Sequence, residues 1–303
     1  MSLTAFTSSI ELGLFYSLMT LGLFISYRIL DIADLTVDGS FTLGAAVCAM
    51  VTISGHPILA IVAAGFTGAL AGIVTAFLQT KLKIQPILSG ILTMTGLYSI
   101  NIMVMGGSAN KSLNGQTTII SLLKNIGIPS FYISLILGLI VATIAGTFII
   151  MFLQTQTGLS IRATGDNEDM VRSSSINVNL MKTIGLSMAN MLVAISGAFI
   201  AQYQSFADVS SGVGMVVIGL ASLIIGEIIF GKKSIKRNVI AVIFGSIIYR
   251  FIISIALEIN ISFSSMKLVS AIIITLAISF PVIKENIKLY QLKKRSKISA
   301  EHN

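Results

Sequence analysis

The 303-residue sequence has little of what soluble enzymes and disulfide-stabilised proteins use. Only 11% of its residues are charged, whereas a soluble domain carries about a quarter. The single cysteine, Cys48, excludes an intrachain disulfide and a multi-cysteine metal site, and two histidines, His56 and His302, exclude a histidine-rich one. Tryptophan is absent, so aromatic side chains at a membrane surface have to be Phe and Tyr. A polytopic membrane protein is the class that fits these absences.

Motifs for chemistry are also missing. The sequence has no Gly-x-x-x-x-Gly-Lys-Ser/Thr loop, so this chain is not expected to bind ATP in that manner. Paired carboxylates, a nucleophile elbow and metal-ligand clusters do not occur outside the apolar segments. We therefore expect no enzymatic activity, no catalytic or metal-binding residue and no bound cofactor. Energy for any transport has to come from ions or from another subunit.

Apolar segments of about 20 residues, the length that crosses a bilayer as a helix, recur along the chain. We expect an all-α polytopic membrane protein with nine crossings, in which residues 1–283 form the transmembrane domain and 284–303 a basic tail. The second and seventh crossings, near Gly39 and Gly214, are predicted to be broken helices. The nine predicted crossings are residues 10–28, 35–54, 58–80, 86–105, 130–153, 183–203, 213–230, 239–257 and 266–283.

The basic residues predict the orientation. With nine crossings the two termini lie on opposite sides, and 16 of the 20 Lys and Arg residues fall on the side of the basic tail. Three of the others, Lys111, Lys124 and Lys267, fall on the opposite side. Because cytoplasmic loops carry an excess of Lys and Arg, we expect an N-terminus outside and a cytoplasmic C-terminus. Topology thus accounts for the formal charge of +8, and no nucleic-acid partner is expected.

Two polar connectors suggest an internal repeat. Residues 31–44 join the first two predicted crossings, and residues 205–214 join the sixth and seventh. Five crossings separate the connectors, and an odd offset makes the second copy inverted relative to the first. Inverted repeats are a feature of transporters, in which the substrate path lies between the repeats.

Polar residues near the start of the second predicted crossing are candidates for this path. Thr36, Asp38 and Ser40 would not share a face of a regular helix, but in a segment broken at Gly39 they could surround a pore. A carboxylate at membrane depth costs about 2.5–3.5 kcal/mol on insertion scales. Asp38 is therefore predicted either to line the path or to cap the helix of the second crossing, and both remain open. The predicted path residues are Thr36, Asp38, Ser40, Thr42, Asn101, Ser211 and Ser222.

Two further charges fall within predicted crossings. Glu227 lies late in the seventh and Arg250 lies midway along the eighth. Opposite charges on adjacent crossings could pair and so lower the cost of placing each in the membrane. Few other ionisable groups lie in the crossings, which weighs against a proton relay.

The most informative stretch is the polar loop of residues 158–182, between two long apolar segments. It contains a predicted short helix, residues 168–175, with Asp166 and Asn167 placed to cap its start. A capped helix held just outside a bilayer needs a partner on which to dock. The predicted docking residues are Asp166, Asn167, Glu168, Asp169, Met170, Val171, Arg172 and Ser173.

The loop also carries a resemblance. The run Gly158-Leu-Ser-Ile-Arg-Ala-Thr-Gly-Asp-Asn-Glu168, followed by Ile176-Asn177, resembles the cytoplasmic loop of permeases in the branched-chain amino-acid and ribose family of ATP-binding cassette (ABC) importers. Ser175 stands where that family often has glycine. The segments 35–45, 196–199 and 219–226 also resemble this family, and the resemblance covers residues 10–283. The 35–45 version is most similar to permeases for amino acids, including aromatic ones.

This resemblance implies a permease subunit of a bacterial cell membrane that forms the path for a small solute, most simply an amino acid. Two permease copies would form the pathway, two ABC ATPases would bind ATP and Mg at the inner face, and an extracytoplasmic solute-binding protein would deliver the substrate. The helix in the 158–182 loop would be the coupling helix. Two alternatives remain: a sugar or nucleoside importer of the same family, and a stand-alone secondary transporter or channel.

Overall fold

The computed structural model describes residues 3–124, 130–231, 234–259, 268–273, 275–276 and 279. Within these residues, seven helices are long and apolar enough to cross a membrane, and α10 (Met215–Phe230) is shorter. Half of the ninth predicted crossing, 266–283, lies outside the described residues. The long helices are α1 (Leu3–Leu23), which continues as the π-helix η1 (Phe24–Ile29), α2 (Thr36–Ile53), α3 (Pro57–Thr80), α4 (Pro86–Val104), α6 (Ser130–Gln154), α9 (Val178–Gln204) and α11 (Ile235–Glu258).

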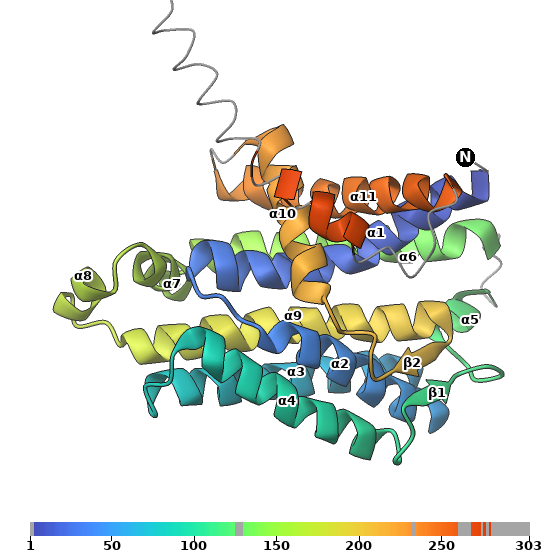
Figure 1. Cartoon of the computed structure of the whole chain (residues 1–303), viewed down its shortest axis with the longest axis horizontal. Helices are drawn as coiled ribbons and strands as arrows, with labels where there is room; N and C mark the ends of the chain where they lie inside the picture. The colour runs from blue at the N-terminus through green and yellow to red at the C-terminus, as the bar shows by residue number, and fades with distance from the viewer. Residues whose placement is uncertain are drawn as a thin grey trace, which may run out of the picture.

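The short elements lie at the two ends of the bundle (Figure 1). At one end are α7 (Gln156–Asp166) and α8 (Glu168–Ser173); at the other are α5 (Ile119–Lys124) and two strands, β1 (Asn110–Ser112) and β2 (Phe206–Asp208). The strands pair antiparallel, with Lys111 opposite Ala207. The sequence did not predict α5, α7 or the strands, because each is too short to give a periodic pattern.

The helix α9 is the centre of the packing. It contacts α1, α2 and α3 along its length, and α11 lies against α1 and α10. Small residues allow the close approach: a Cβ atom added at Gly68 or Gly72 of α3 would overlap backbone atoms of α9. Small residues are typical of helix contacts in membranes, where packing rather than the hydrophobic effect holds helices together. Aromatic pairs fill the core, and Phe15 of α1 stacks on Phe199 of α9 with 5.6 Å between ring centroids.

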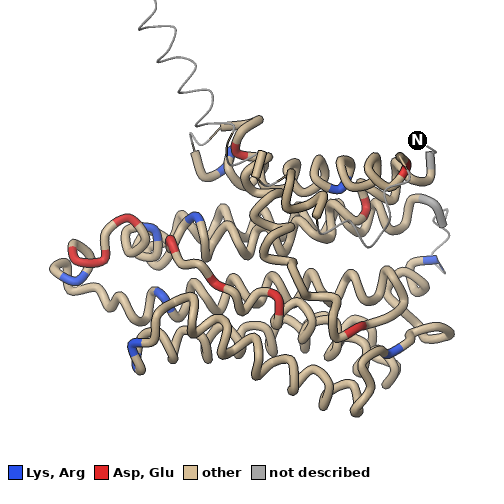
Figure 2. The backbone as a smooth tube through the Cα atoms, in the orientation of Figure 1, with Lys and Arg blue, Asp and Glu red and all other residues tan. Residues whose placement is uncertain are grey.

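The outer faces of several helices are apolar. On α3 and α4 the exposed side chains include Ile58, Phe66, Phe77 and Met103. Figure 2 shows that Lys, Arg, Asp and Glu are sparse along the long helices and gather around α7 and α8. This distribution is the one expected when hydrocarbon surrounds the bundle and water surrounds its ends.

Candidate functional site

The polar loop folds as two consecutive helices rather than one. Thr155 caps α7, its hydroxyl accepting a hydrogen bond from the Gly158 amide, and Asn167 caps α8, its Oδ1 accepting from the Met170 amide at 3.0 Å. The predicted cap at Asn167 is therefore present, whereas Asp166 is the last residue of α7 and does not cap α8. The helix α8 ends at Ser173, two residues before the predicted end. Ser175 has a positive φ of 60°, a conformation that is incompatible with a right-handed helix.

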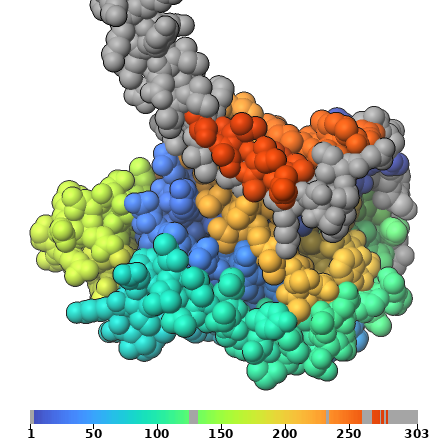
Figure 3. Space-filling view, viewed as in Figure 1, coloured from blue at the N-terminus to red at the C-terminus, as the bar shows by residue number. Residues whose placement is uncertain are grey.

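The side chains of α8 divide into an anchoring face and an exposed face. Val171 is buried at 1% exposure, and Glu168 forms ion pairs with Arg172 and with Lys182 of α9. Asp169 and Met170 are exposed. Glu168 and Val171 hold the helix in place, so the free surface of α8 is smaller than the predicted set of eight residues. In Figure 3 the yellow-green residues of α7 and α8 project from one end of the molecule.

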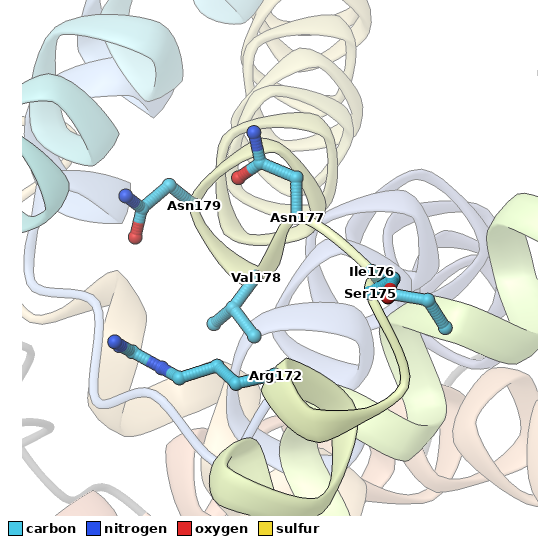
Figure 4. A pocket seen from close by; sticks show the side chains of 6 residues that line it. All are labelled: Arg172, Ser175, Ile176, Asn177, Val178 and Asn179. Carbon is cyan, nitrogen blue, oxygen red and sulfur yellow. The ribbon is translucent and has the colours of Figure 1, made fainter.

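A shallow cleft lies between α8 and the start of α9. Its volume is about 320 Å³, and Figure 4 shows the Arg172 side chain extending below Val178 toward Asn179. The lining is mostly polar and includes Ser175, Asn177 and Asn179 as well as Arg172. The cleft therefore offers hydrogen-bond donors and one positive charge next to the exposed face of α8.

A second polar group is buried inside the bundle. The Asp34 carboxylate accepts hydrogen bonds from the Thr36 amide at 2.9 Å and from Asn190 Nδ2 at 2.7 Å, and the Ser40 hydroxyl donates to Asn190 Oδ1 at 2.7 Å. Burial raises the pKa of the Asp34 carboxyl, which lies in the connector before α2, although the bonds from Thr36 and Asn190 oppose the shift. The network ties that connector and the first turn of α2 to α9.

The same network continues to two more helices. The Thr36 hydroxyl lies 2.7 Å from that of Thr75 on α3, and Thr75 donates to Thr93 on α4 at 3.1 Å. Thr36 and Ser40 are both fully buried and share one face of a regular helix that starts at Thr36. The predicted break of this helix at Gly39 is therefore wrong. In this conformation the two hydroxyls join helices, and their role as path residues stays a prediction.

Asp38 points away from this network and holds α10. Its two carboxylate oxygens accept hydrogen bonds from the Gly214 and Val216 amides, both at 2.8 Å. Of the two roles predicted for Asp38, the cap for α2 is wrong: the N-cap position of α2 is Leu35, and Asp38 instead caps a helix that lies far along the chain. Its role in the path stays a prediction. A carboxylate at a helix N-terminus satisfies orphan amides and complements the helix dipole.

Two glycines permit this contact. Gly214 has φ +89°, a conformation that side chains rarely adopt, and it is the N-cap residue of α10. A Cβ added at Gly212 would overlap the Asp38 carbonyl oxygen and the Thr42 hydroxyl. The predicted break of the seventh crossing is therefore present at Gly212–Gly214, and it brings the connector of residues 205–214 against the first turns of α2.

The remaining predicted path residues lie around this junction. Asn101 of α4 is buried and donates from Nδ2 to the Gly39 carbonyl, Thr42 donates to the Asp38 carbonyl, and Ser222 donates to the Ile218 carbonyl within α10. Ser211 lies in the connector, where its amide donates to the Asp208 carbonyl. The structure thus gathers Thr42, Asn101 and Ser211 around Asp38 and Gly39, whereas Ser222 lies further along α10.

The predicted ion pair between Glu227 and Arg250 is wrong. Glu227 pairs with Arg28 of η1, with 2.9 Å between Oε1 and Nε. The Arg250 guanidinium lies over the ring of Tyr16, 4.9 Å from its centroid. The π-helical end of α1 carries Arg28 to the end of α10, and sequence order alone gave no sign of it.

Sequence reasoning also missed Asp34 and Asn190, which form the centre of the buried network. A signal for Asp34 was available, because it stands four residues before Asp38 in a short connector between apolar segments. The partners of Asn190 could not be named from the sequence, because they depend on the packing of α9 on α2.

Comparisons with known proteins place this geometry in context. The family described as "Branched-chain amino acid transport system / permease component" matches residues 6–279. The chain is 38% identical over 269 residues to a tyrosine transport system permease protein of Clostridioides difficile (strain R20291), covering 86% of each chain. It is 25% identical to the ribose import permease protein RbsC of Escherichia coli (strain K12), covering 81% of this chain and 75% of that one. Its fold is similar to PsaBC from Streptococcus pneumoniae in complex with Fab, with a TM-score of 0.51, 15% identity and coverage of 90% and 89%.

Proposed function

Because the chain belongs to the family of branched-chain amino acid transport system permease components, we propose that it is the permease subunit of an ABC importer for amino acids. The family makes it a membrane-embedded transport subunit rather than an enzyme. Its own role is to form the path and to change conformation, while hydrolysis takes place on partner subunits.

The observation that carries this proposal is α8. It is capped by Asn167, anchored by Val171 and by the ion pairs of Glu168, and it projects from one end of the bundle with Asp169 and Met170 exposed. A stand-alone secondary transporter needs no such docking helix. We propose that two ABC ATPases, which would hold ATP and Mg, bind α8 and the adjoining cleft. A second permease copy completes the pathway, and an extracytoplasmic solute-binding protein delivers the substrate.

The relatives support an amino acid as the substrate. The tyrosine transport permease is 38% identical to this chain, whereas the ribose permease is 25% identical. The ribose relative keeps a sugar as the second candidate. An amino acid carries two charges, and the Asp38 carboxylate, which accepts hydrogen bonds at the start of α10, would compensate one of them on a path between α2 and α10.

Reconstitution tests this function. The permease is inserted into liposomes with the ATPases and the solute-binding protein that are produced with it, and uptake of labelled tyrosine and labelled ribose is measured. We expect tyrosine uptake that requires ATP inside the vesicles and disappears with a non-hydrolysable analogue. Uptake driven by an ion gradient without the ATPases would contradict the proposal. ATP-driven uptake of ribose but not of tyrosine would show that the substrate is a sugar rather than an amino acid.

The orientation is part of the proposal. With the α8 end cytoplasmic, β1 lies at the opposite, outer end of the bundle (Figure 1). In intact cells, a cysteine replacing the exposed Ser112 is expected to react with a membrane-impermeant maleimide, while a tag placed after Asn303 is reached only after the membrane is opened. If both sites react from the same side, the nine-crossing arrangement is wrong.

A further inference from the structure

Arg250 is a cation in the middle of a membrane-spanning helix. It lies on α11 (Ile235–Glu258), and that helix is antiparallel to α1, because Ser246 donates a hydrogen bond to the Gly13 carbonyl and Phe251 packs on Phe6. Its guanidinium reaches the Tyr16 ring, one turn beyond Gly13 in the direction of the Ile235 end of α11. The side chain therefore turns toward the middle of the helix and away from the nearer end at Glu258.

Helical side chains lean toward the N-terminus of their helix, and this direction keeps the Arg250 charge away from the nearer interface. Long basic side chains near a helix end normally extend to the nearest interface, where water hydrates the charge. Among the described residues no carboxylate lies within ion-pair distance of Arg250: the buried Glu11 of α1 accepts a hydrogen bond from the Tyr203 hydroxyl, and Glu227 pairs with Arg28. The Tyr16 ring offsets only part of the cost of removing a guanidinium from water.

The surroundings of Arg250 connect to the proposed path. Close contacts of Gly245 with Ser222 and of Gly226 with Ala241 show that α11 is antiparallel to α10, which places the backbone of Arg250 level with the first turn of α10. Its guanidinium, turned toward the Ile235 end of α11, lies level with a later turn of α10. Asp38 caps that same turn. The Tyr16 ring also stacks on Phe41 of α2, with 6.0 Å between centroids and 7° between planes, and Phe41 lies one turn after Asp38.

We propose that Arg250, supported by Tyr16, binds the carboxylate group of the transported solute inside the membrane. This inference rests on the proposed importer function and specifies the chemistry that its path recognises. An amino acid needs both of its charges compensated during passage, and Asp38 supplies only one sign. Arg250 of α11 supplies the other, and the stacked rings of Tyr16 and Phe41 link α1, on which its guanidinium lies, to α2, which carries Asp38. A guanidinium bonds a carboxylate through two parallel N–H groups, which gives both strength and orientation.

The first test uses charged thiol reagents and does not depend on transport. In a background with the buried Cys48 replaced by alanine, Ser254→Cys places a thiol one turn after Arg250 on the same face of α11. In the assembled complex, with and without ATP, an anionic methanethiosulfonate should react several-fold faster than a cationic one. Adding Arg250→Gln should remove that preference. If neither reagent reacts in any nucleotide state, or if Arg250→Gln leaves the ratio unchanged, the site is not an aqueous anion contact and the proposal is overturned.

The second test measures uptake of labelled tyrosine by the reconstituted complex. Arg250→Gln should lower the uptake rate about ten- to hundred-fold, which is the range expected for losing a charge-assisted hydrogen bond. Arg250→Lys keeps the charge and should restore part of the rate, and tyrosine binding by the solute-binding protein should not change. Equal rates for Arg250→Gln and the unmodified chain would overturn the proposal. If the unmodified complex shows no ATP-driven uptake, the importer function fails instead, while the thiol reaction still reports on Arg250.

Discussion

Replacing Asp38 by alanine is expected to lower ATP-driven uptake by at least about ten-fold, because α10 loses the carboxylate that holds its N-terminus. The two bonds to the Gly214 and Val216 amides are removed together. Loss of a helix cap costs about 0.5–2 kcal/mol, and the carboxylate here also complements the dipole of a helix that starts inside the bundle. Uptake in proteoliposomes measures the effect, and substrate binding by the solute-binding protein should be unchanged.

A matched control separates this effect from simple loss of charge. Asp31→Asn removes a carboxylate from an exposed position of the connector before α2 and should leave uptake close to that of the unmodified chain. Asp38→Asn keeps one acceptor oxygen and should fall between the alanine variant and the unmodified chain. If Asp38→Ala transports normally, α10 does not depend on this cap.

Whether Asp38 also lines the path needs a separate measurement. With Cys48 replaced by alanine, Asp38→Cys should react with aqueous thiol reagents in one nucleotide state, when α10 has moved away from α2. If the thiol is protected in every nucleotide state, Asp38 is a structural cap and does not line the path.

Reversing the charge and polarity of the exposed face of α8 is expected to reduce ATP-driven uptake about ten-fold or more while leaving the permease folded. The sharpest variant is Asp169→Arg with Met170→Asp, because both side chains are exposed. Glu168 is a poorer target than its position in the sequence indicated, because its ion pairs with Arg172 and Lys182 hold the loop on α9. Charge reversal at a docking surface opposes association and also slows encounter.

Two measurements check this prediction. Co-purification of the ATPases with the permease should fall together with uptake, whereas thermal unfolding of the permease alone should be unchanged. His56→Arg adds a positive charge at the opposite end of the bundle, in the connector between α2 and α3, and should affect neither quantity. Full ATPase co-purification and full uptake with the α8 variant would contradict the assignment of α8 as the coupling helix.

The features that the sequence determined by itself are local ones. Length and apolarity decide whether a segment can span hydrocarbon, so α2, α3 and α4 begin and end within one or two residues of their predicted limits. Asn167 caps α8 because its side chain reaches the amide of Met170, three residues later. The break before α10 follows from the backbone conformation of Gly214, which favours glycine. Each of these properties depends on a few neighbouring residues.

The tertiary structure alone decided which polar groups meet, because this depends on which helix faces pack together. Asp38 caps α10 rather than its own helix, Arg28 takes the place predicted for Arg250 beside Glu227, and Asp34 accepts a hydrogen bond from Asn190 of α9. In a low-dielectric bundle a buried polar group needs a hydrogen-bond or ion-pair partner. The sequence indicates that a partner is needed but does not identify it. Small residues such as Gly212, which lies against Asp38, allow the segments to approach closely enough for these contacts. Arg250 lies over the Tyr16 ring instead of forming the ion pair that the sequence predicted.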